Sequence, residues 1–228
     1  MMDQSRLNEA IQFGKSLTET IQGIELPSDS RIDAAAVCYG MVINHFDAIL
    51  LTLQNNIYAS SLSLERIQLE ALINGEWIRL CASEDQIESL LQKDKYPITT
   101  CKRIEQIEEK GAQTTEEWGG ELKKYFDDNW KELCSYTHSS ARHLLQWAAG
   151  HTIEPNYNNG ELLGLLDRAE RILASAIIAV ATIANSSEAS NKIEEIMSRK
   201  WPAISSAAMP SMIRQDMSLP LAGFHLEG

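Results

Sequence analysis

The amino-acid sequence predicts an all-α fold: an antiparallel helical bundle with a loosely ordered C-terminal tail. Apolar residues recur at helical spacing in nearly every segment, and almost no segment alternates as a strand does. Glycine (12) and proline (6) are scarce among the 228 residues. The hydrophobic content of 44% and the charged content of 23% are those of a globular protein.

The length predicts a single domain, because domains usually contain about 100–200 residues. We expect the bundle to occupy residues 1–200, with its core in residues 31–184. Residues 201–228 contain three prolines and no clear period. This composition predicts the irregular tail.

The first half of the chain predicts a helical hairpin. A first helix is expected over residues 5–22 and a long second helix from about 30 to 57. The long helix has apolar residues at spacings of 3, 4, 3 and 4 (Ile43, Phe46, Leu50, Leu53 and Ile57). Asn55 suits its end, and Ser60 or Ser61 suits the N-cap of the next helix. So short a connection favours an antiparallel hairpin.

The middle of the chain predicts a series of shorter helices. A helix over residues 61–82 completes the hairpin. Ser83 followed by Gln86 is a capping box for a helix over residues 84–93, and residues 100–111 form an exposed helix.

Two more helices are expected before the next long segment. Thr114 with Glu117 is a second capping box, which opens a polar helix over residues 115–134. An amphipathic helix follows over residues 137–149, with Thr137 at its N-cap.

The clearest periodicity lies near the C-terminus. Seven apolar residues recur at spacings of 4, 3, 4, 3, 4 and 3 (Leu162, Leu166, Ala169, Leu173, Ala176, Val180 and Ile183). This helix is either central to the bundle or packs against a second copy of the protein. A shorter helix is expected over residues 189–200.

Charge and cysteine content bear on partners and compartment. The net charge is −12 at pH 7, so a broad role in coating nucleic acids is disfavoured. The four cysteines form no Cys-x-x-Cys pair, and the N-terminus shows no export signal. The longest apolar run, 172–184, is shorter than the roughly 20 residues that cross a bilayer. We therefore expect a soluble, cytoplasmic protein that does not bind membranes.

The motifs of several enzyme classes are missing from the sequence. It has no Gly-x-Gly-x-x-Gly turn, no Gly-x-Ser-x-Gly elbow and no His-Glu-x-x-His pair. Cys134, His138 and His143 could begin a zinc site, but no further pair of ligands has suitable spacing. We therefore expect neither a cofactor nor a metal.

Two polar groups lie on stripes that the helical period predicts to be apolar. Arg66 and Glu70 begin a stripe that Ile73, Trp77 and Leu80 extend, at spacings of 4, 3, 4 and 3. As an i,i+4 pair they can form an ion pair, which is either structural or part of a charged site. His138 begins the apolar stripe of the 137–149 helix, where backbone N–H groups would attract anions.

These residues carry a resemblance to a known superfamily. Residues 60–70 (Ser-Ser-Leu-Ser-Leu-Glu-Arg-Ile-Gln-Leu-Glu), then Gly-Glu-Trp at 75–77 and Tyr-Thr-His-Ser at 136–139 precede a long apolar helix. This order resembles uncharacterised bacterial proteins related to the HEPN superfamily, over roughly residues 31–184. The resemblance implies a helical bundle that often dimerises, and metal-independent ribonucleases or non-catalytic partners in toxin–antitoxin and phage-defence systems.

Two hypotheses follow for the function. HEPN nucleases carry an arginine four to six residues before a histidine, and no histidine here has one at that distance. The first hypothesis is therefore a non-catalytic or regulatory HEPN-like module that dimerises and binds a protein partner. The alternative is an unorthodox ribonuclease, which would bind RNA. In it, Arg66 would hold a phosphate, His138 would act as acid or base, and Glu70 would orient one of them.

Overall fold

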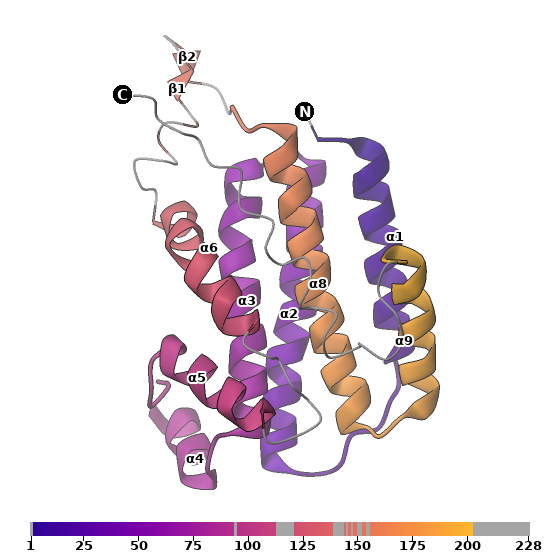
Figure 1. The fold of residues 1–228 in the computed structure, drawn as a ribbon, viewed down its shortest axis with the longest axis vertical. Helices are drawn as coiled ribbons and strands as arrows, with labels where there is room; N and C mark the ends of the chain where they lie inside the picture. The colour runs from indigo at the N-terminus through magenta and orange to yellow at the C-terminus, as the bar shows by residue number, and fades with distance from the viewer. Residues whose placement is uncertain are drawn as a thin grey trace.

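The computed structural model of the chain is a bundle of α-helices (Figure 1). The structure describes residues 2–93, 95–112, 121–138, 144, 146, 148–149, 152–153 and 156–202. Their helices are α1 (Gln4–Thr20), α2 (Ser30–Gln54), α3 (Tyr58–Leu80), α4 (Glu84–Lys93), α5 (Thr100–Gly111), α6 (Glu121–Thr137), α8 (Asn159–Ile183) and α9 (Ser187–Lys200). The short strands β1 (Ala148–Ala149) and β2 (Thr152–Ile153) pair antiparallel. The predicted all-α class is confirmed.

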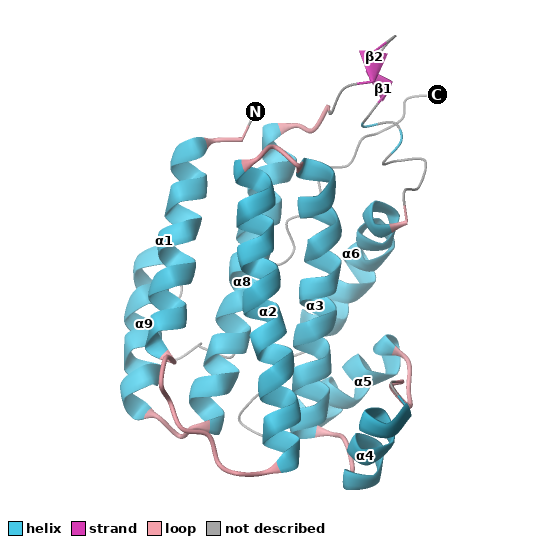
Figure 2. Cartoon of the chain, turned by 180° about the vertical axis from the view of Figure 1, so that it is seen from behind, coloured by secondary structure: helices cyan, strands magenta, loops and turns pink. Residues whose placement is uncertain are grey.

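Helices α2 and α3 form the antiparallel hairpin that the sequence predicts. At one end the Ser61 hydroxyl donates to Thr52 Oγ1 at 2.8 Å. Toward the other end the Tyr39 hydroxyl donates to Glu76 Oε1 at 2.7 Å. Helix α8 packs against both helices, and α1 and α9 lie together at one side of the bundle (Figures 1 and 2).

Helix α8 is the central helix of the bundle. Six residues of its heptad stripe are buried (Leu162, Leu166, Ala169, Leu173, Ala176 and Val180). The seventh, Ile183, is partly buried against the same core. The first of the two expectations for this helix is therefore confirmed, and the stripe is used inside the chain.

Side-chain caps mark where several helices begin. Asp3 and Asp29 accept hydrogen bonds from backbone N–H groups in the first turns of α1 and α2. Asn158 and Ser186 do the same for α8 and α9. The predicted capping box before α4 is present, because Ser83 and its Gln86 partner exchange hydrogen bonds of 2.9 and 3.2 Å.

The expected cap of α3 is wrong. Helix α3 begins at Tyr58, and neither Ser60 nor Ser61 caps it. Asn55 ends α2 and Asn56 has a positive φ of 58°, so the chain reverses direction earlier than expected. The Ser61 hydroxyl contacts Thr52 instead, inside the hairpin.

The expected boundary between the helices 115–134 and 137–149 is also wrong. Helix α6 continues through Thr137, whose hydroxyl donates back to Leu133 O at 3.0 Å. Ala148–Ala149 form strand β1 instead of the end of a helix. The predicted capping box of Thr114 and Glu117 lies outside the described residues.

Two clusters of buried side chains make up the core. One lies between α1, α2, α8 and α9, and the other between α2, α3, α5, α6 and α8. Helix α1 contributes Leu7 and Leu17 to the core, and α9 contributes Ile193 and Met197. Beyond Pro202, the predicted tail lies outside the described residues.

Candidate functional site

The structure brings the three predicted site residues together. Arg66 Nη1 lies 2.9 Å from His138 Nε2, although the two residues are 72 positions apart. Arg66 Nη2 lies 3.3 Å from Glu70 Oε1 on the same helix. The guanidinium also lies over the Trp130 ring, 4.9 Å from its centroid. We call these four residues the Arg66 cluster.

The backbone around His138 differs from the sequence-based expectation. The His138 N–H donates to Cys134 O at 3.0 Å, so His138 follows the last turn of α6. A helix C-terminus has exposed carbonyl groups and a partial negative charge. The anion-attracting N–H groups expected at this position are therefore not supplied by α6.

Arg66 and His138 contact each other through Nη1 and Nε2. A guanidinium only donates, so Nε2 is the acceptor when this contact is a hydrogen bond. His138 is exposed, whereas Arg66 and Glu70 are partly buried. An exposed imidazole beside a guanidinium can bind an anionic group, although Glu70 offsets much of the positive charge of Arg66.

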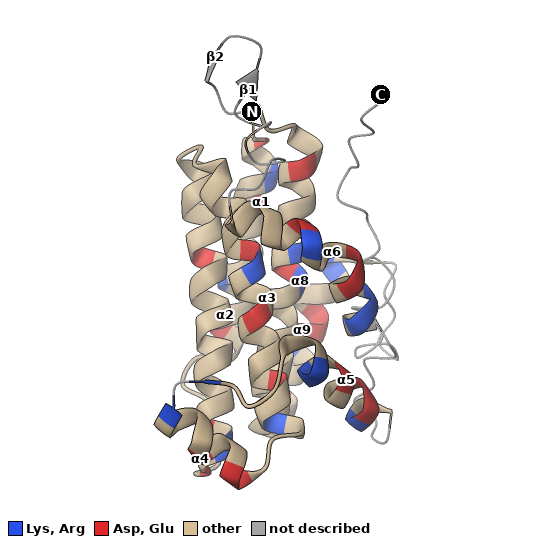
Figure 3. Cartoon of the chain, turned by 90° about the vertical axis from the view of Figure 1, so that its left-hand side faces the viewer, with Lys and Arg blue, Asp and Glu red and all other residues tan. Residues whose placement is uncertain are grey.

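Charged residues of both signs also cover α5 and the rest of α6 (Figure 3). The Arg66 cluster thus lies on the edge of α3 that faces a mixed-charge surface. Ion pairs on such partly solvated surfaces contribute about 0–1 kcal/mol.

A buried ion pair that the sequence analysis missed lies one residue earlier on α3. Glu65 is fully buried and accepts from Arg168 Nη2 at 2.8 Å and from the Tyr125 hydroxyl at 2.9 Å. Burial alone would lower the pKa of Arg168, but the adjacent Glu65 carboxylate raises it above the ordinary value. Burial, and then the same carboxylate, raise the pKa of Tyr125. This network joins α3, α6 and α8.

A second buried polar network joins α2 to α3. Glu76 accepts from the Tyr39 hydroxyl at 2.7 Å and from Arg79 Nη2 at 2.8 Å. Burial raises the pKa of Tyr39 well above its ordinary value, and the Glu76 carboxylate adds to the shift. Glu65 and Glu76 lie on the same core stripe as Leu69 and Leu72, at spacings of 4, 3 and 4. The sequence contains this spacing, but the neighbouring stripe from Arg66 to Leu80 has it as well.

The described residues contain no candidate metal site. Within these ranges, no group of three or more His, Cys, Asp or Glu side chains could hold a metal ion. The four cysteines, Cys38, Cys81, Cys101 and Cys134, are free thiols. Burial raises the pKa of the Cys38 thiol and raises that of Cys81 to about 11. These two thiols are therefore poor nucleophiles near neutral pH.

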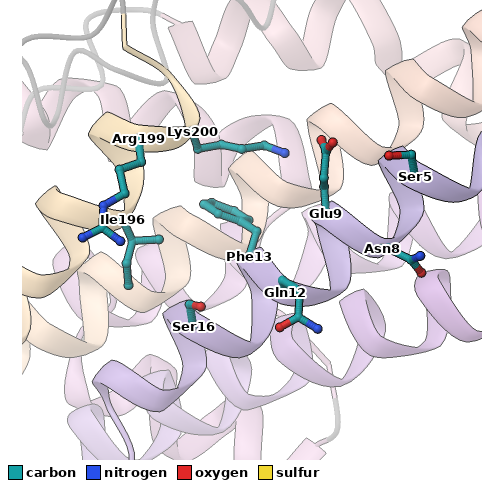
Figure 4. Close-up of a pocket in the computed structure, with 9 residues that line it drawn as sticks. All are labelled: Ser5, Asn8, Glu9, Gln12, Phe13, Ser16, Ile196, Arg199 and Lys200. Atoms are coloured by element: carbon teal, nitrogen blue, oxygen red, sulfur yellow. The ribbon is translucent and has the colours of Figure 1, made fainter.

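A cavity of about 530 Å³ lies between α1 and α9 (Figure 4). Phe13 forms its apolar floor, with Glu9 on α1 and Arg199 and Lys200 on α9 around it. Lys200 Nζ already pairs with Glu170 at 3.1 Å and lies over the Phe13 ring. The cavity includes no residue of the Arg66 cluster.

The solvent side of the hairpin carries a row of uncharged residues. Val37, Met41, Asn44, Ala48 and Leu51 recur along α2 at spacings of 4, 3, 4 and 3, opposite the buried positions of the helix; Ala48 is half-buried and the other four are exposed. Three of them are unusually exposed for large apolar residues, and so is Ile67 on α3 (Val37 65%, Leu51 61%, Met41 45% and Ile67 36%). We call these six residues the α2–α3 face.

Helix α2 is long and apolar enough to cross a membrane by length and composition alone, with a mean hydropathy of 1.5 over its most apolar stretch. Eight of its residues are nevertheless buried against the rest of the bundle. A core helix of a water-soluble bundle has the same properties. Val37, Met41 and Leu51 are large apolar residues of α2 outside those eight, and they belong to the α2–α3 face.

Comparisons with known proteins place the chain in one family. No curated protein matches the chain, and no solved structure matches it. A family described as "Family of unknown function (DUF6988)" matches residues 39–202. The matched range begins within α2 and contains the Arg66 cluster and the buried pair of Glu65 and Arg168. The chain belongs to this DUF6988 family.

Proposed function

We propose that the protein is a regulatory helical module that acts by self-association and partner binding, and not by catalysis. The α2–α3 face is the observation that carries this proposal. Contiguous exposed apolar residues are uncommon on monomers and mark interaction sites. The face has no charged residue among its six members, although the chain carries a net charge of −12.

The fold explains why this face, and not the α8 stripe, supports the proposal. The α8 heptad is buried inside the chain and is not available to a partner. The exposed row on α2 has the same heptad spacing, which is the spacing that two packed helices use. The resemblance to HEPN proteins adds a setting to the proposal, a bacterial toxin–antitoxin or phage-defence system in the cytoplasm.

One specific observation favours a second candidate, a metal-independent ribonuclease. The contact between Arg66 and His138 places a guanidinium beside an exposed imidazole. In this reading Arg66 holds a phosphate of the RNA, His138 acts as acid or base, and Glu70 orients Arg66. Substrate phosphate would have to displace the contact between Arg66 and His138 to free Nε2.

The first experiment measures the oligomeric state of the purified full chain by light scattering, from about 1 to about 100 µM, a range that spans micromolar affinities. We expect a dimer. A monomer throughout this range, with no specific protein partner in a pull-down, would overturn the proposal.

The second experiment separates the two candidate functions. Expression toxicity and total-RNA integrity are measured for the wild type, His138→Ala and Arg66→Ala, with thermal melts of all three proteins. The regulatory proposal predicts intact RNA in every case. Growth arrest with RNA fragments in the wild type, lost in variants that melt normally, would establish the ribonuclease instead.

A further inference from the structure

We infer that the α2–α3 face binds a second copy of the chain, with the two α2 helices antiparallel and a two-fold axis passing near Asn44. The inference rests on the proposed function and gives the partner and the geometry of the contact. It follows from the pattern of the face, its charges and its size.

The exposed row on α2 is nearly symmetric about Asn44. Val37 and Leu51 lie seven residues before and after it, and Met41 and Ala48 lie three before and four after. An antiparallel pair therefore places Val37 against the partner's Leu51. It also places the large Met41 side chain near the partner's small Ala48.

Asn44 suits the position on the axis. Its amide has both donors and acceptors, so it can pair with the same group of the second copy. A single asparagine in an otherwise apolar heptad row is known to fix the register of paired helices. The exposed Asn44 side chain thus supplies a polar contact that a two-fold arrangement satisfies.

The charges beside the row favour the antiparallel arrangement. Asp33 and Asp47 are exposed on α2 near the face. With the axis at Asn44, Asp47 lies opposite the partner's Met41, and Asp33 lies opposite the partner's Asn55. A parallel pair would place each aspartate beside its own copy, where like charges repel. The dipoles of two antiparallel helices also point in opposite directions, which is a favourable electrostatic arrangement.

The size of the face fits a weak homodimer. The row from Val37 to Leu51 spans about 21 Å at 1.5 Å per residue. With α3 alongside, the outer side of the hairpin is about 20 Å wide. The resulting area of about 400 Å² per partner is half of the roughly 800 Å² that a standard interface buries, which is the range of transient complexes.

The test uses glutamate substitutions on the full chain. Val37→Glu and Leu51→Glu each place a charge in the proposed interface, while Leu91→Glu changes an equally exposed leucine on α4. We expect each of the two interface variants to raise the dimer dissociation constant by a factor of about ten or more. The control should leave this constant unchanged. Circular dichroism checks that all three variants fold.

A cysteine at the axis tests the geometry separately. In an antiparallel dimer Asn44→Cys places two thiols together, so mild oxidation gives a disulfide-linked dimer on a non-reducing gel. Leu91→Cys and the wild type, with its native cysteines, give the background. Cross-linking of Asn44→Cys at the background level would overturn the contact. Equal cross-linking of Val37→Cys would overturn the antiparallel geometry, because only parallel helices bring the two Val37 positions together, whereas antiparallel helices hold them about 21 Å apart.

The outcomes distinguish this inference from the function on which it rests. A wild-type dimer that persists in both interface variants overturns the inference but leaves self-association standing. A wild-type monomer at all concentrations overturns the inference, and it overturns the proposed function as well when a pull-down yields no specific protein partner. A monomer that floats with lipid vesicles, and loses this property in Val37→Glu, assigns the face to a membrane and also overturns the inference.

Discussion

Replacing Arg168 by methionine should expose the cost of an unpaired buried charge. Arg168 Nη2 donates to Glu65 Oε2 at 2.8 Å, and a second bond joins its Nε to Oε1. Glu65 is fully buried, so water cannot replace these donors. After Arg168→Met the carboxylate would keep the Tyr125 hydroxyl at 2.9 Å as its remaining partner in this network.

The expected loss is large compared with the total stability. Removing one partner of a buried ion pair costs about 3–5 kcal/mol, and domains are stable by only about 5–15 kcal/mol. At about 2–4 °C per kcal/mol for a chain of this size, the midpoint of thermal unfolding should fall by roughly 6–20 °C. Glu65→Leu combined with Arg168→Met removes both charges, so the double variant should recover about 2 kcal/mol relative to the sum of the singles.

Urea denaturation followed by far-UV circular dichroism would measure these free energies for the wild type, both single variants and the double variant. Arg199→Met is the matched control, because Arg199 and Glu195 form an exposed i,i+4 pair worth under about 1 kcal/mol. A loss below about 1 kcal/mol for Arg168→Met, or strict additivity in the double variant, would refute the reasoning.

Two further predictions concern residues of α1 and α2. A Cβ at Gly14 would lie 2.3 Å from Phe46 Cε1, whereas one at Gly40 meets nothing within 4 Å. Gly14→Ala should therefore lower the free energy of unfolding by about 1–3 kcal/mol, and Gly40→Ala should raise it by about 0.5–1 kcal/mol. Equal thermal midpoints of the two variants would contradict this. Burial lowers the pKa of His45 from 6.5, so the unfolded chain binds its proton more readily. The free energy of unfolding of the wild type should then fall as the pH drops below about 6.5. Thermal melts should show a smaller fall for His45→Gln, and equal pH profiles of the two proteins would contradict this.

Local signals in the sequence predicted most of the helices. The helix predicted over residues 100–111 matches α5, and the one over residues 84–93 matches α4. The capping box at Ser83 contains both of its partners within four residues, so no distant contact is needed to form it. The apolar row from Ile43 to Leu53 on α2 likewise reflects the period of one helix.

Boundaries that depend on distant contacts were harder to predict. Serine is a residue type that often caps helices, but the Ser61 hydroxyl contacts Thr52 on the neighbouring helix. Thr137 also suits a cap by type, yet it lies in the last turn of α6 and its hydroxyl donates to Leu133 O, four residues earlier in the same helix. In both cases the side chain can form either kind of bond, and the residue type alone does not select between them.

The candidate site was predicted in part for the same reason. Arg66 and Glu70 are i,i+4 neighbours, so their contact follows from the sequence. The contact with His138 depends on how α6 packs against α3, which no local pattern specifies. Glu65 was missed because α3 is buried on more than one side. The stripes that begin at Glu65 and Arg66 both continue into apolar residues, so the period does not distinguish the core stripe from its neighbour.

Heptad spacing has opposite meanings in the two long apolar helices. In α8 the row from Leu162 to Ile183 meets other helices of the same chain, because apolar residues surround that helix. In α2 the bundle uses one apolar side, and a second row from Val37 to Leu51 remains exposed. Heptad spacing alone does not show whether a row is buried within the chain; only the packing does. Because the packing buries the α8 row, the contact that we propose with a second copy falls on α2.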